Sequence, residues 1–295
     1  MNKKSVRRML SILLGLMFLV SLCGCIPNAY SREEGEQAEK ELKGYVEEWL
    51  DQNVPGAYIN SCEVESSYIT SGAAFGNGLT DIITGAYSVS GKSHEFLYVR
   101  SSDAMYTQDL YDEAENIVRD LFFYGLGFSK EDLIISDVYR VEVDIQHKIY
   151  YDADEDGKLE SEPSHGYFIY LPSALKQEDL DNYILDGLSS KKVIVGGLDF
   201  ELNGDIEPED IKLEVLRLYP GFGTIKIKTD NADYCIMISQ EDIDGKTKDV
   251  ISIEKKTISN ATKTDATAQS AQKAYNSHYY IYDLESLHFI KDYGD

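Results

Sequence analysis

Hydrophobic and polar positions alternate with two different periods along this chain, and the changes of period predict its elements. Between residues 36 and 52 the apolar positions return every three or four residues, which predicts an amphipathic helix. They are Ala38, Leu42, Tyr45, Val46, Trp49 and Leu50. The same spacing predicts further helices at about 110–124, 177–185 and 207–219.

A period of two, typical of strands, dominates the rest of the chain. It is clearest in the segment 132–152, where apolar Val141, Val143 and Ile145 alternate with polar residues. We therefore expect a long strand with one buried face and one solvated face. Other strand-like segments are 57–70, 81–90, 94–101, 166–172, 191–202, 249–258 and 278–290, with a hairpin at 223–239.

Helices followed by strands recur along the chain without regular βαβ spacing. This order predicts an α+β fold, a mainly antiparallel sheet with a few amphipathic helices packed on one face, arranged as two subdomains. The predicted divisions are a signal peptide (1–24), a tether (25–35), an N-terminal α+β subdomain (36–128), a C-terminal α+β subdomain (129–258), a low-complexity linker (259–276) and a C-terminal strand segment (277–295). The linker contains no large aliphatic residue, so it cannot contribute to a core.

The first residues have the features of a secretory signal. Four basic residues precede an apolar run at 9–22, which as a helix is shorter than the ~30 Å hydrocarbon core of a membrane. The run ends in Leu22-Cys23-Gly24-Cys25, which resembles the lipobox of bacterial lipoprotein precursors. The resemblance implies cleavage after Gly24 and attachment of acyl chains, such as palmitate, to Cys25.

This resemblance predicts a location for the protein. The acyl chains would hold the mature chain on the cell membrane, at the cell envelope, facing the extracytoplasmic side. Two alternatives stay open, an ordinary secretory signal that is cleaved further along and an uncleaved N-terminal anchor. A redox or metal site at Cys23 and Cys25 is disfavoured by the adjacent apolar run.

The composition is strongly acidic. The chain has 52 acidic and 28 basic residues, and loss of the first 24 residues would remove four basic and no acidic residues, leaving a net charge of −28. Such a surface repels nucleic acids, which are bound through clustered Lys and Arg. A basic envelope protein, a peptide or a glycan is a more suitable partner, while solubility alone also explains the charge.

Two cysteines remain after the expected cleavage, Cys62 and Cys235, and both lie in strand-like segments. If their strands are neighbours, one disulfide could join them; otherwise they are two buried thiols. So few cysteines exclude a small disulfide scaffold.

An acidic segment at residues 152–159 resembles the first part of the calcium loop of EF-hand and dockerin proteins. Alternate carboxylates could converge on a cation, with Gly157 at the turn. The candidate calcium ligands are Asp152, Asp154, Asp156 and Glu160. However, Pro163 stands where the loop needs its last carboxylate, and strands flank the segment, so an acidic hairpin turn is the alternative.

No catalytic motif is present in the sequence. The five histidines are scattered, and there is no H-E-x-x-H, G-x-S-x-G or phosphate-binding glycine loop. We therefore predict a membrane-anchored lipoprotein that acts as a binding or scaffolding module. The alternatives are a calcium-dependent adhesion or sensor module and an envelope hydrolase whose site is assembled by the fold.

Overall fold

The computed structural model describes residues 32–71, 74–151, 160–258 and 275–294. Its contacts divide the chain into two compact units. Unit 1 comprises residues up to 93, 98–104 and 147–164; unit 2 comprises 94–97, 105–146 and 165 onward. Each unit is thus assembled from several stretches of chain, whereas the two predicted subdomains, 36–128 and 129–258, are consecutive segments.

The described chain is largely sheet with some helices. The helices are α2 (Arg32–Asn53), α3 (Tyr111–Gly125), α4 (Leu180–Ser190) and α5 (Glu214–Leu218). The strands are β1 (Tyr58–Ser71), β2 (Ala74–Val89), β3 (Lys92–Val99), β4 (Ala104–Thr107), β5 (Leu133–Tyr151), β6 (Glu160–Phe168), β7 (Leu171–Pro172), β8 (Val193–Leu202), β9 (Phe222–Lys228), β10 (Ala232–Ile243), β11 (Lys246–Ile258), β12 (Tyr275–Asp283) and β13 (Phe289–Gly294). The sheet is mixed rather than purely antiparallel, because β8 and β9 run parallel.

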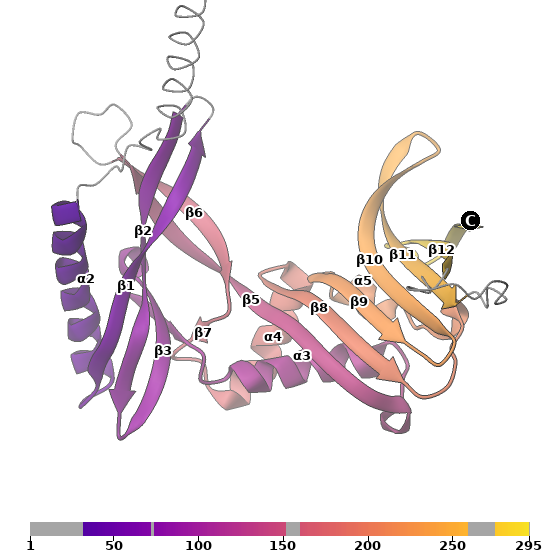
Figure 1. Ribbon diagram of the computed structural model, residues 1–295, viewed down its shortest axis with the longest axis horizontal. Helices are drawn as coiled ribbons and strands as arrows, with labels where there is room; N and C mark the ends of the chain where they lie inside the picture. The colour runs from indigo at the N-terminus through magenta and orange to yellow at the C-terminus, as the bar shows by residue number, and fades with distance from the viewer. Residues whose placement is uncertain (1–31, 72–73, 152–159, 259–274, 295) are drawn as a thin grey trace, which may run out of the picture. The chain divides into compact units, whose positions relative to one another are not determined.

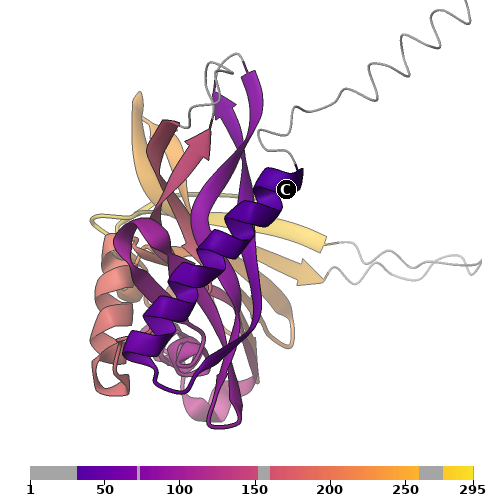
Figure 2. The same ribbon diagram turned by 90° about the vertical axis from the view of Figure 1, so that its left-hand side faces the viewer.

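Unit 1 is built on the antiparallel hairpin of β1 and β2, with α2 lying along it (Figures 1 and 2). The expected helix at 36–52 is confirmed, and its apolar stripe buries Val46 and Leu50. Strand β2 contributes buried Ile82 and Ile83. The end of β5 joins this sheet, where Leu79 of β2 is in register with Tyr150.

A buried carboxylate links three segments of unit 1. Asp81 on β2 is only 2% exposed, and its two oxygens accept hydrogen bonds from the backbone N–H groups of Ser101 (2.8 Å) and Lys148 (2.6 Å). Burial of a charge is costly unless such donors compensate it. Asp81 therefore fixes β2 against the turn after β3 and against β5.

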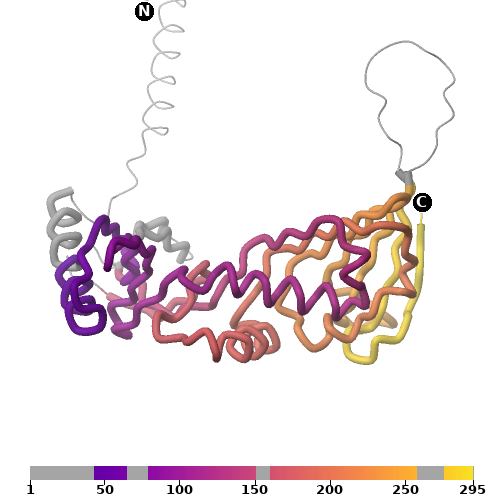
Figure 3. The backbone as a smooth tube through the Cα atoms, turned by 90° about the horizontal axis from the view of Figure 1, so that it is seen from below, coloured from indigo at the N-terminus to yellow at the C-terminus, as the bar shows by residue number. Residues whose placement is uncertain are grey.

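Unit 2 contains a sheet with the strand order β13-β12-β11-β10-β9-β8-β5. Its later strands follow one another as neighbours, from the orange β8 to the yellow β13 (Figure 3). The β10–β11 hairpin bends strongly along its length (Figure 1). The expected hairpin at 223–239 is confirmed, since Lys228 of β9 is in register with Asp233 of β10.

One face of this sheet forms the core of unit 2 together with α3 and α4. Phe123 of α3 contacts Phe200 of β8, with ring centroids 5.4 Å apart. The helix expected at 110–124 is therefore confirmed, and α4 packs on the same strand. Gly125 allows α5 to approach α3, because a Cβ atom there would lie 2.6 Å from a methyl group of Val215.

The helix expected at 207–219 is only partly present. A 3-10 turn covers Pro208–Asp210, and the α-helix α5 begins at Glu214. Glu207 and Asp210 form a capping box around the turn, with the Asp210 carboxylate accepting the backbone N–H of Glu207 at 2.9 Å. The turn ends at Ile211, whose backbone is extended, and the next N–H, that of Lys212, bonds to the carbonyl of Leu126 (2.9 Å) instead of continuing a helix.

Candidate functional site

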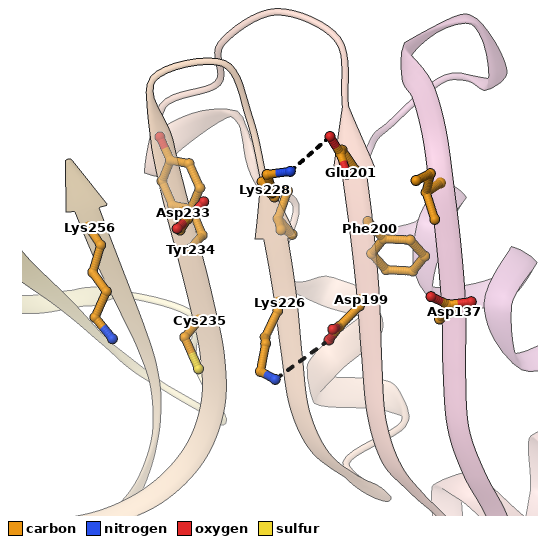
Figure 4. Close-up of a pocket in the computed structure, with 12 residues that line it drawn as sticks. Asp137, Asp199, Phe200, Glu201, Lys226, Lys228, Asp233, Tyr234, Cys235 and Lys256 are labelled. Carbon is orange, nitrogen blue, oxygen red and sulfur yellow. Dashed lines mark hydrogen bonds and ion pairs between the residues drawn. The ribbon is translucent and has the colours of Figure 1, made fainter. Parts of the chain in front are cut away.

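The face of the unit 2 sheet opposite α3 and α4 carries a hollow of about 490 Å³ (Figure 4). It extends over five adjacent strands, β5, β8, β9, β10 and β11. The lining residues are Ile135, Asp137, Asp199, Phe200, Glu201, Lys226, Ile227, Lys228, Asp233, Tyr234, Cys235 and Lys256. We call this the charged hollow, because seven of these residues are acidic or basic.

The local sequence explains why charges gather on this face. In β8 the segment Asp199-Phe200-Glu201 buries Phe200, which leaves the two acids on the other side of the strand. In β9, Ile227 is likewise buried between Lys226 and Lys228. The parallel register places Lys226 opposite Asp199 and Lys228 opposite Glu201, so an acidic stripe meets a basic stripe (Figure 4).

Cross-strand ion pairs join these two stripes. Lys228 Nζ lies 2.9 Å from the Glu201 carboxylate, and Lys226 Nζ lies 4.0 Å from that of Asp199. The hydrogen bond to Glu201 raises the pKa of Lys228 above its ordinary value. Opposite charges that face each other across neighbouring strands attract, so these pairs help to stabilise a face that is open to water.

A second polar cluster occupies β10 and β11. Cys235 is in register with Glu254, whose carboxylate lies 3.1 Å from Lys256 Nζ. Glu254 also accepts hydrogen bonds from the hydroxyl groups of Ser277 (3.0 Å) and Tyr279 (2.9 Å). Although partial burial raises the pKa of Glu254, the hydrogen bonds from Lys256, Tyr279 and Ser277 outweigh it and hold that pKa below its ordinary value.

The Cys235 thiol is not an activated nucleophile. Burial raises the pKa of this thiol, and the nearby Glu254 carboxylate raises it further, whereas Lys256 and Lys226 act in the opposite direction. A thiol with a raised pKa is protonated at neutral pH and reacts slowly. The lining of the charged hollow also contains no histidine that could act as its base.

Two carboxylates in the charged hollow are available to a ligand. Asp137 lies in register with another acid, Asp199, and Asp233 lies at the start of β10. Within the part of the chain that the structure describes, neither carboxylate has a Lys, Arg or His nitrogen within 4.0 Å. The hollow therefore offers cationic and anionic groups at the same time, in stripes that follow the strands.

Of the candidate site residues named from the sequence, Cys235 lines this hollow, whereas Cys62 and Glu160 do not. Cys25 and three of the expected calcium ligands, Asp152, Asp154 and Asp156, lie outside the described residues. Glu160, the fourth, is exposed at the start of β6 in unit 1. Within the described ranges no group of three or more His, Cys, Asp or Glu side chains could hold a metal ion, so the calcium site stays a prediction.

The proposed disulfide depended on two neighbouring strands, and that condition is not met. Cys62 lies on β1, which pairs with β2 in unit 1. Cys235 lies on β10, which pairs with β9 and β11 in unit 2. The structure does not join the two cysteines, and Cys235 is a free thiol.

Sequence reasoning did not bring the charged residues of the hollow together in one site. A usable signal was present, since β8 carries two acids and β9 two lysines at a period of two. Complementary charges with this spacing favour neighbouring strands. The parallel pairing that brings the two stripes together involves a crossover through α5 and could not be read from the period alone.

Three histidines of unit 2 contact a carboxylate. The contacts are His94–Asp109 (2.7 Å), His165–Asp144 (3.2 Å) and His278–Asp292 (2.9 Å). None of these residues lines the charged hollow. The histidine–carboxylate pairs therefore do not provide it with an acid–base group.

Among the described helices, none combines the length and the apolar composition needed to cross a membrane. The comparisons with known proteins give no relative from which a function could be transferred. No protein-family model, curated protein or solved structure matches this chain.

Proposed function

We propose that this protein is a lipid-anchored extracytoplasmic binding module that recognises a ligand in the charged hollow. The observation that supports this function is the meeting of acidic and basic stripes on an open sheet face, with two further carboxylates beside them. A polar ligand that carries both signs of charge, such as an extended peptide, fits this pattern better than a ligand of one sign.

Binding is favoured over catalysis by the chemistry of the hollow. Its single thiol has a raised pKa, and its lysines face carboxylates, so neither group is prepared to act as a nucleophile. Electrostatic complementarity can select a partner without any reacting group. We also propose the finer fold assignment, an α+β class with helices on one face of a mainly antiparallel sheet.

The anchor is the second part of the proposal. It rests on the Leu22-Cys23-Gly24-Cys25 segment, which would place Cys25 at the processed N-terminus, on the outer side of the cell membrane. Two long acyl chains bind a bilayer stably, since each buried methylene contributes about 0.8 kcal/mol. The folded units would then be presented to ligands at the cell envelope.

A peptide array tests the binding proposal. The purified full chain, in detergent micelles, is applied to short peptides whose sequences vary the number of positive and negative residues. We expect peptides with both signs to be retained best at low salt and released at high salt, because exposed ion pairs are screened. Lys228→Glu should weaken retention of these peptides.

Lys176→Glu is the matched control for that variant. Lys176 lies outside the charged hollow, is exposed, and has its own ion pair with Glu178 at 3.6 Å, so the change in net charge is the same. Equal retention by both variants would show that the hollow does not bind the peptides.

A further inference from the structure

A second hollow lies on the other face of the unit 2 sheet, near its β13 edge. Its volume is about 410 Å³, and its lining residues are Pro208, Glu209, Ile211, Leu213, Tyr280, Tyr282, Phe289 and Asp292. Tyr280 is in register with Ile253, which is fully buried, so this groove continues the core surface of the sheet. We call it the aromatic groove.

Three aromatic rings form one wall of the aromatic groove. Tyr282 and Phe289 meet edge to face, with centroids 5.6 Å apart, and Tyr280 lies two residues before Tyr282 on the same side of β12. Phe289 is 53% exposed, although it is a large apolar side chain. The other wall contains Ile211 and Leu213. An aliphatic chain could therefore lie between these walls with its length desolvated.

The charged residues that line the aromatic groove are both acidic. Glu209 and Asp292 line it, and no Lys or Arg is among the lining residues. Asp292 contacts His278 at 2.9 Å, while Glu209 has no cationic group within 4.0 Å among the described residues. Nearby Lys255 is engaged by another carboxylate, that of Glu207.

The field of these carboxylates reaches the tyrosine hydroxyl groups. Burial raises the pKa of Tyr280 and of Tyr282, and the Glu209 carboxylate raises both further, with Asp292 adding to the effect on Tyr280 and Lys255 opposing it there. The aromatic groove thus combines ring faces with the carboxylate of Glu209, which has no ion pair among the described residues. Cations are attracted by both features, because the face of an aromatic ring is the negative end of its quadrupole.

We propose that the aromatic groove binds an arginine side chain of a basic partner polypeptide. The planar guanidinium stacks on aromatic rings and forms paired hydrogen bonds with a carboxylate, and its aliphatic stem fits the apolar wall. Charge complementarity selects this occupant, since the rim would repel phosphate and other anionic groups. The site is separate from the charged hollow, which lies on the opposite face of the sheet.

Calorimetric titration with a short peptide tests this proposal. The full chain, in detergent micelles, is titrated with an acetylated and amidated peptide that contains one arginine between glycines, and with its citrulline counterpart. Citrulline keeps the shape of arginine but has no charge. We expect the arginine peptide to bind at least about tenfold more tightly. Equal affinities would overturn the proposal.

Variants locate the bound peptide. Glu209→Gln and Phe289→Leu should each lower the affinity for the arginine peptide several-fold. Tyr293→Leu is the control, because Tyr293 is an equally exposed aromatic residue on β13 that stacks on Tyr279 outside the groove. If Phe289→Leu, with an unchanged melting temperature, binds as well as the wild type does, the groove is not the site.

Two further measurements distinguish this proposal from binding in the charged hollow and from binding of a quaternary ammonium headgroup. Lys228→Glu should leave the arginine peptide bound, so failure of the peptide array and failure of this site can be told apart. Soluble phosphocholine, titrated in the same way, presents a quaternary ammonium group in place of arginine without offering a bilayer to the acyl chains. Binding of phosphocholine without binding of the arginine peptide would contradict a polypeptide partner.

Discussion

The charged hollow and the aromatic groove lie on opposite faces of the same sheet. They differ in the groups that lie next to their carboxylates. In the charged hollow, Glu201 and Asp199 each meet a lysine of the next strand. In the aromatic groove, Glu209 meets no cation among the described residues, and aromatic rings take the place of lysines. The first arrangement suits a ligand of mixed charge, and the second suits a cation.

The comparison also shows how each face is stabilised. The core face depends on burial, as in the contact of Phe200 with Phe123. The open face pairs opposite charges across neighbouring strands. Charges on the open face can therefore be exchanged at small cost in stability, whereas apolar residues of the core face cannot.

The largest effect is expected on the core face. Phe200→Ala should lower the free energy of unfolding by about 3–5 kcal/mol, because it removes a buried ring and leaves a cavity. Its neighbour in sequence, Glu201, points to the open face, and Glu201→Ala should cost less than about 1 kcal/mol. Urea unfolding of both variants provides the comparison. Similar losses would contradict the division of β8 into two unlike faces.

Acid should weaken the open face through Glu254. Its pKa is held below the ordinary value when folded, so its ionised form contributes stability above that ordinary value, near 4.5, and the contribution is lost as the pH falls. Glu254→Gln removes this titration. Melting temperatures measured from pH 6 to pH 3 should therefore fall less steeply for the variant than for the wild type. A parallel decline would show that the three hydrogen bonds to Glu254 do not favour its charge.

A smaller effect is expected on the reactivity of Cys235. Burial and Glu254 raise the pKa of this thiol, so its alkylation by iodoacetamide should be slow at pH 7 and accelerate only at alkaline pH. Glu254→Gln should shift the pH profile of the rate to lower pH. Mass spectrometry of the peptide that contains Cys235 separates it from Cys62. A profile that moves to higher pH would contradict the account.

The sequence alone predicts most of the helices and strands, but it does not locate the two sites. Val141, Val143 and Ile145 are buried as their period predicted, because one face of a strand must meet the core. The segment 207–219 differs because the backbone is extended at Ile211 and the N–H of Lys212 bonds to the carbonyl of Leu126. A hydrogen bond to a residue far away in the chain is not visible in the periodicity of the sequence.

The two sites required tertiary information for different reasons. The charged hollow depends on a parallel pairing between β8 and β9, and the period of a strand does not specify its neighbour. The aromatic groove brings Glu209 next to Tyr282, residues far apart in the chain. The segment that carries these tyrosines was predicted as a strand at 278–290, whereas the acidic residue beside their rings was not predicted.

The most direct test of the binding proposal exchanges the charges of one ion pair. In the double variant Glu201→Lys/Lys228→Glu the ion pair is retained, so the free energy of unfolding should change little, but the polarity of the two stripes is reversed at this position. We predict that the folded double variant loses the mixed-charge peptides that the wild type retains on the array. Unchanged retention of the same peptides would contradict the charged hollow as the binding site.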